Sequence, residues 1–144
     1  MTDSFDTDLY GLGVHDCLLG VMILASMSDG VVRTSELLTI ESVIDHFPIF
    51  AEYNEADVKK VCAVMNAILL MPDGIDRFLT FLKVILPPRL RETAYAIACD
   101  VVAADGKLEQ AELRYLEEIA CHLQVDPLYV AAIERSTRAL YARF

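Results

Sequence analysis

The apolar positions of this chain recur with the spacing of helices along almost its whole length. No segment alternates apolar and polar residues over a sustained run, and no hairpin signal occurs. We therefore predict an all-α protein with seven helices. The predicted helices cover residues 14–27, 34–47, 54–71, 75–85, 88–103, 109–123 and 126 to the C-terminus.

Prolines and capping residues mark the ends of several of these helices. Pro48 ends the second helix, Pro88 suits the first position of the fifth, and Asp126 with Pro127 opens the last. The short fourth helix, residues 75–85, is apolar on more than one face. This pattern favours either the inner position of the bundle or an oligomer interface.

One helix-turn-helix unit is written twice. "SDGVVRTSE" at residues 28–36 and "ADGKLEQAE" at residues 104–112 share Asp-Gly, an aliphatic residue two positions after the glycine, and Glu six positions after it. The apolar positions of the helix that follows each phrase also repeat, at the same separation along the chain as the two phrases. Because a helical hairpin cannot bury its apolar face alone, we predict that the copies pack about a pseudo-twofold axis. Residues 12–53 should then superpose on residues 88–128.

Composition adds an expectation about location and assembly. Hydrophobic residues make up 55% of the 144 residues, an excess that suggests a homodimer with the fourth or last helix at the contact. No apolar run reaches the roughly 20 residues of a membrane-spanning helix, and the acidic N-terminus argues against a signal peptide. We expect a cytoplasmic protein, with peripheral membrane association left open. Residues 1–11 are predicted to be a flexible acidic N-terminus, and residues 12–144 a single helical domain.

Charge and cysteine usage argue against several function classes. The chain has 22 Asp and Glu against 12 Lys and Arg, a balance that opposes nucleic-acid binding. The four cysteines are widely spaced without a C-x-x-C pair, so a reduced compartment fits and a zinc cluster does not. No metalloprotease, serine-hydrolase or phosphate-loop motif occurs. We predict no catalytic residue and expect a protein that is not an enzyme.

The repeated phrase can be explained without a ligand. Gly30 and Gly106 would end helices in the left-handed conformation, and the aspartate before each glycine would bond the turn. The glutamate of each copy would lie in the first turn of the next helix, where the helix dipole favours it. Neither copy is an EF-hand, because the positions before each Asp-Gly lack the oxygen-bearing side chains that Ca²⁺ requires. A repeated structural turn is therefore one interpretation.

The other interpretation is a metal site. If the pseudo-twofold axis brings both junctions to one end of the molecule, their carboxylates converge, and such oxygen ligands suit Mg²⁺, Ca²⁺ or Mn²⁺. Asp100 lies in an otherwise apolar stretch and is an additional acidic candidate, expected at an exposed edge or beside an arginine. The candidate ligands are Asp29, Glu36, Asp105 and Glu112.

These residues also carry a family resemblance. "LGVMILASMSDGVVRTSELLTIESVI" and "CDVVAADGKLEQAELRYLEEIACHLQVD" resemble two copies of the signature of TerB-like domains, named for the B component of the bacterial tellurite-resistance system. The resemblance runs from about residue 12 to about residue 139. Arg33 departs from the internal symmetry, because the second copy has Glu109 there, so the two halves need not bind alike.

The resemblance implies a compact, internally symmetric helical domain in a cytoplasmic bacterial protein linked to stress responses. It implies that the four carboxylates named above form a metal-binding surface. It also implies partners among other stress-response proteins and no established reaction. Because tellurite is an oxyanion, its direct capture by an acidic site is electrostatically unfavourable, and a role in resistance would be indirect.

Overall fold

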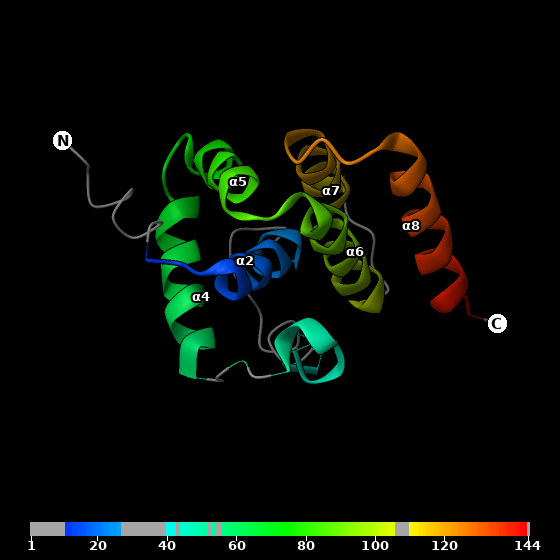
Figure 1. Ribbon diagram of the computed structural model, residues 1–144, viewed down its shortest axis with the longest axis horizontal. Coiled ribbons are helices and arrows are strands. Elements are labelled where there is room, and N and C mark those ends of the chain that lie inside the picture. The colour runs from blue at the N-terminus through cyan, green and yellow to red at the C-terminus, as the bar shows by residue number, and fades with distance from the viewer. Residues whose placement is uncertain are drawn as a thin grey trace.

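The chain forms helices and no strand over the residues that its computed structural model describes, which are 11–26, 40–42, 44–51, 53, 56–105 and 110–143 (Figure 1). Residues 40–42 and 44–46 are helical. No helix in these ranges is long and apolar enough to cross a membrane. The named elements are α2 (Val14–Ser26), the 3-10 helix η1 (Pro48–Phe50), α4 (Ala56–Leu69), α5 (Gly74–Ile85), α6 (Pro88–Asp105), α7 (Gln110–His122) and α8 (Pro127–Leu140).

Prolines and one capping aspartate set helix ends where the sequence predicts them. Helix α6 begins at Pro88 and α8 at Pro127, since the missing N–H of proline costs nothing at the first helical position. Asp126 Oδ1 accepts a 2.8 Å hydrogen bond from the backbone N–H of Leu128, which is an N-cap. Pro48 follows the helical residues 44–46, as predicted, and also starts the η1 turn, which the sequence analysis did not predict.

Helix α2 is the central helix of the bundle. It packs against α6, α4 and α7, and residues 17–25 are all buried. Its sequence explains this position, because "CLLGVMILA" carries no charged side chain and offers no face suited to water. Helix α5, for which the sequence allowed the inner position, instead lies beside α4 and α7 with Val84 81% exposed (Figure 1).

Two glycines permit close packing around α5. A Cβ atom at Gly20 of α2 would lie 2.8 Å from Cζ of Phe78 and 3.1 Å from Sδ of Met65. A Cβ atom at Gly74 would overlap the backbone carbonyl oxygen of Ile68. Helix α5 therefore approaches α2 and the end of α4 more closely than larger residues would allow at these positions.

Helix α8 lies at the edge of the molecule, mainly against α6 (Figure 1). None of its residues is buried. Two tyrosine hydroxyls link α6 to this C-terminal region: Tyr95 donates to Glu134 at 2.8 Å, and Tyr141, directly after α8, donates to Asp100 at 2.9 Å. Hydrogen bonds to carboxylates therefore supplement the limited apolar contact of α8.

The internal repeat stays a prediction. Residues 27–39, which contain the first Asp-Gly pair, and residues 106–109, which contain Gly106 of the second pair, lie outside the described residues. The pseudo-twofold relation between the two copies is therefore not tested by the fold. The same holds for the homodimer.

Candidate functional site

The second copy of the repeated phrase joins α6 to α7. Helix α6 ends at Asp105 and α7 begins at Gln110, so four residues separate two helices that pack against each other. Glu112 is the third residue of α7, in the first turn, where the helix dipole favours negative charge. Only the backbone of Asp105 and Glu112 is described, and it places Asp105 at the end of α6 and Glu112 near the start of α7.

The first copy lies outside the described residues, including Asp29, Gly30 and Glu36. Whether the two junctions converge therefore remains a prediction. Within the part of the chain that is described, no group of three or more His, Cys, Asp or Glu side chains is placed to hold a metal ion.

Asp100 is the acidic candidate whose side chain is described. It is half-buried, five residues before the end of α6, and its Oδ1 accepts the 2.9 Å hydrogen bond from Tyr141. The sequence led us to expect an exposed edge or an arginine partner, and the partner is a tyrosine. Burial, followed by the bond to Asp100 and its negative charge, raises the pKa of Tyr141 to about 12. The hydroxyl thus stays a proton donor at neutral pH.

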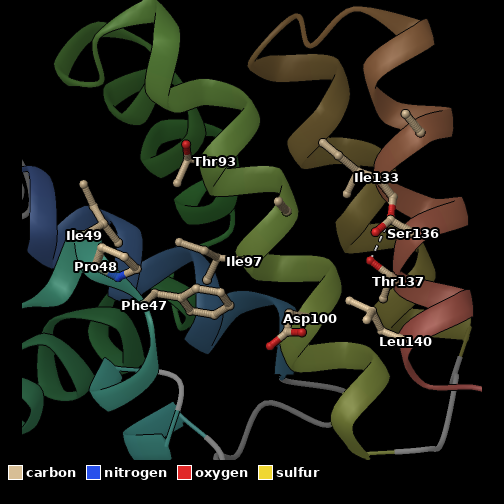
Figure 2. Close-up of a pocket in the computed structure, with 12 residues that line it drawn as sticks. Phe47, Pro48, Ile49, Thr93, Ile97, Asp100, Ile133, Ser136, Thr137 and Leu140 are labelled. Carbon is tan, nitrogen blue, oxygen red and sulfur yellow. Dashed lines mark hydrogen bonds between the residues drawn. The ribbon is translucent and has the colours of Figure 1, made fainter.

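Asp100 also lines a groove of about 490 Å³ between η1, α6 and α8 (Figure 2). Most of the other lining side chains are apolar. Figure 2 shows Asp100 at one end of the groove, between Phe47 and the Leu140 end of α8. From η1 and α6 the lining includes Ile49, Thr93 and Ile97, and from α8 it includes Ile133, Ser136 and Thr137.

A second hollow, of about 420 Å³, is lined by residues of α6, α7 and the α8 region. Its polar groups include Glu134, which accepts from Tyr95, and the side chain of Arg138. Cys99 also lines it, and burial raises the pKa of this thiol to about 11. The thiol is therefore protonated at neutral pH and is not an activated nucleophile.

A third hollow, of about 510 Å³, lies at the N-terminus of α2 and includes Asp16, Tyr53 and Asp57. Asp16 Oδ2 accepts from the backbone N–H of Gly13 at 3.0 Å, and its Oδ1 accepts from the Tyr53 hydroxyl at 2.7 Å. Burial and then the bond to Asp16 raise the pKa of Tyr53 above its ordinary value. Asp16 is thus occupied by structural bonds that hold the start of α2.

Sequence reasoning missed all three tyrosine–carboxylate bonds. The partners are separated by 37, 39 and 41 residues, so no local spacing reveals them. The usable signal is local sequence, because a tyrosine buried in an apolar stretch of a helix must find a partner for its hydroxyl. Tyr95, which is 1% exposed, meets that condition.

The described fold is a bundle of helices, and the Asp-Gly phrase occurs at a helix-to-helix junction in its second half. These features define a helical domain over the described residues. A family model described as "Tellurite resistance protein TerB" matches residues 15–135. The chain belongs to the TerB family, and the matched range contains both copies of the phrase. Comparison with curated proteins and with solved structures found no significant match.

Proposed function

We propose that this protein is a non-enzymatic stress-response module of the tellurite-resistance type, which binds a divalent cation and docks to other proteins. Asp29, Glu36, Asp105 and Glu112 are the proposed ligands. The observation that carries the proposal is the family match over residues 15–135, which includes both Asp-Gly junctions.

The chemistry of the four residues fits a hard cation. Carboxylate oxygens are preferred ligands of Mg²⁺, Ca²⁺ and Mn²⁺. The positions of Asp105 at the end of α6 and of Glu112 near the start of α7 support a shared role for this pair. We propose that the pseudo-twofold relation brings the first junction to the same end of the bundle. A bound cation would neutralise carboxylates that otherwise repel one another.

The charge of the protein bears on its place in resistance. The net charge is −10, so an oxyanion such as tellurite is repelled from an acidic site, while a cation is attracted to it. We therefore propose that the protein contributes to resistance indirectly, through cation-dependent docking to other stress-response proteins in the cytoplasm.

Thermal unfolding with and without added cation tests this proposal. A ligand that binds only the folded state raises the melting temperature, so Mg²⁺, Ca²⁺ or Mn²⁺ should raise that of the wild type. The double variant Asp29→Asn, Asp105→Asn should lose the shift. The double variant Asp45→Asn, Glu92→Gln removes the same charge from exposed positions outside the Asp-Gly junctions and should keep the shift.

One observation favours a second candidate, a scaffold whose acidic phrase is only a turn. Helix α6 extends through Asp105, and Glu112 lies in the first turn of α7. At such positions an aspartate can bond nearby backbone groups and a glutamate interacts favourably with the helix dipole, so neither requires a ligand. In that case no cation shifts the wild-type melt. The Asp29→Asn, Asp105→Asn variant would then lose about 1 kcal/mol per site, the usual cost of a lost cap. If cation binding is correct, the variant should be at least as stable as the wild type without cation, because repulsion is removed.

A further inference from the structure

We propose that the groove between η1, α6 and α8 binds a small molecule with an apolar body and a cationic head group, and that Asp100 receives the head group. This proposal does not depend on cation binding at the Asp-Gly junctions.

The groove has the size and lining of a small-molecule site. Its volume is about 490 Å³, within the range of roughly 300–1,000 Å³ in which such ligands bind. Three separate elements contribute apolar side chains, among them Phe47 before η1, Ile97 of α6 and Ile133 of α8 (Figure 2). An apolar body placed there would remove these side chains from water, which is the main driving force for binding.

Two features keep the groove open. Ala96 of α6 and Ala132 of α8 both line it, and their short side chains leave the space between the two helices unfilled. Leu140 also lines it and is 77% exposed. The exposure of so large an apolar side chain at the rim leaves surface that a ligand would cover.

Asp100 makes the groove selective for charge. It is the charged residue among those lining the groove. Its Oδ1 accepts from Tyr141, and no other hydrogen bond or ion pair to this carboxylate occurs within the described residues. We assign the second oxygen, Oδ2, as the acceptor for the cationic head group. A half-buried carboxylate at the end of an apolar surface attracts a cation more strongly than an exposed one, because the local dielectric is lower.

A set of three matched compounds tests the assignment. Phenylbutylamine, phenylbutanol and phenylbutyrate share one apolar skeleton and differ in the charge of the head group. Each is titrated into the full chain without added divalent cation, and amide NMR spectra report which residues respond. We expect the amine to bind most tightly, the alcohol less tightly and the carboxylate least, with shifts at Ile97, Asp100 and Ile133.

Three single variants locate the site. Asp100→Asn removes the charge but keeps an oxygen that can accept from Tyr141, so it should weaken the amine about tenfold, the usual worth of a charge-assisted bond, and leave the alcohol unchanged. Glu117→Gln removes one charge from an exposed position on α7 and should change neither. Ala132→Phe places a ring in the groove from an exposed position and should weaken all three compounds.

Several outcomes would overturn the proposal. One is equal affinity for the amine and the carboxylate. A second is an Asp100→Asn variant that binds the amine as the wild type does. A third is shifts of the groove residues on raising the protein concentration alone, which would mean that a second copy covers the groove. These outcomes are distinct from a failure of the cation proposal. The Asp29→Asn, Asp105→Asn variant lacks two proposed cation ligands but keeps the groove residues, so it should still bind the amine.

Discussion

The close approach of α5 to α2 makes Gly20→Ala a sensitive test of the packing. In a solvent-exposed helix, alanine stabilises relative to glycine by about 1 kcal/mol. At Gly20, the added methyl would lie 2.8 Å from Phe78 Cζ and 3.1 Å from Met65 Sδ. Both neighbours are fully buried, so the Phe78 ring cannot turn away without displacing other core side chains.

Overpacking of this kind costs about 1–3 kcal/mol. The thioether of Met65 can move, but the end of the Phe78 ring cannot, so we place the cost in the upper half of that range. After the gain in helix propensity is subtracted, Gly20→Ala should lower the free energy of unfolding by about 1–2 kcal/mol. The chain has no tryptophan, so urea unfolding is best followed by far-ultraviolet circular dichroism.

A double-mutant cycle separates packing from propensity. Phe78→Leu removes the ring atoms that the new methyl would meet, so Gly20→Ala should cost much less, or even stabilise, in the Phe78→Leu background. If instead Gly20→Ala stabilises by about 1 kcal/mol in both backgrounds, α5 does not pack on α2 at this point and the reasoning fails.

Two further predictions concern buried polar groups. Tyr95→Phe removes the donor to Glu134 and should lower the free energy of unfolding by about 1 kcal/mol. It should also speed amide exchange in α8. The control Tyr115→Phe changes a half-buried tyrosine with no hydrogen-bond partner in the described residues, and it should alter neither the free energy of unfolding nor the amide exchange. Equal effects of the two variants would show that the Tyr95–Glu134 hydrogen bond does not hold α8 to α6. Burial raises the pKa of Cys17 to about 12 and that of Cys99 to about 11, from 9.0. Above pH 9 these thiols therefore lose their protons in the unfolded chain before they do so in the folded chain. The free energy of unfolding then falls as the pH rises. The loss should approach about 1.4 kcal/mol per thiol and pH unit. The difference between the urea midpoints at pH 8 and pH 10 should shrink in a Cys17→Ala, Cys99→Ala variant, with a remainder from Cys62, whose thiol pKa is also raised by burial. An unchanged pH dependence would contradict the burial.

Much of the helix order could be predicted because its signals are local. Pro88, Pro127 and Asp126 act on the backbone within one turn of themselves, so their effects are the same in any fold. The buried face of α4 follows the helical spacing of its apolar residues, since that spacing fixes which side turns inward. Its buried residues are Val58, Val61, Met65 and Ile68.

Which helix occupies the centre of the bundle was harder to predict, because it depends on the relative hydrophobicity of all the helices that pack around the core. The fourth helix seemed a candidate from its two apolar faces, but Lys83 and Asp76 give it a polar side as well. The run at residues 17–25 has no polar side at all, and this stronger signal was available in the sequence. The position of α8 depends on long-range bonds such as Tyr95–Glu134, for which a sequence offers only the donor and many acceptors.

The candidate site could be predicted only as a set of residue types at a repeated spacing. The family match confirms the resemblance on which the functional interpretation rests. Convergence of Asp29 with Asp105 is a property of tertiary packing, and repetition in the sequence does not determine it. Asp100 illustrates the difficulty, because its tyrosine partner lies 41 residues away.

Calorimetric titration of Mg²⁺, Ca²⁺ and Mn²⁺ into the folded protein tests the central claim most directly, because it counts bound ions. We predict that one cation binds per chain for at least one of these metals. Either Asp29→Asn or Asp105→Asn should weaken this binding, since in our proposal both junctions contribute to the same site. No binding of any of the three, or binding that neither variant alters, would contradict it.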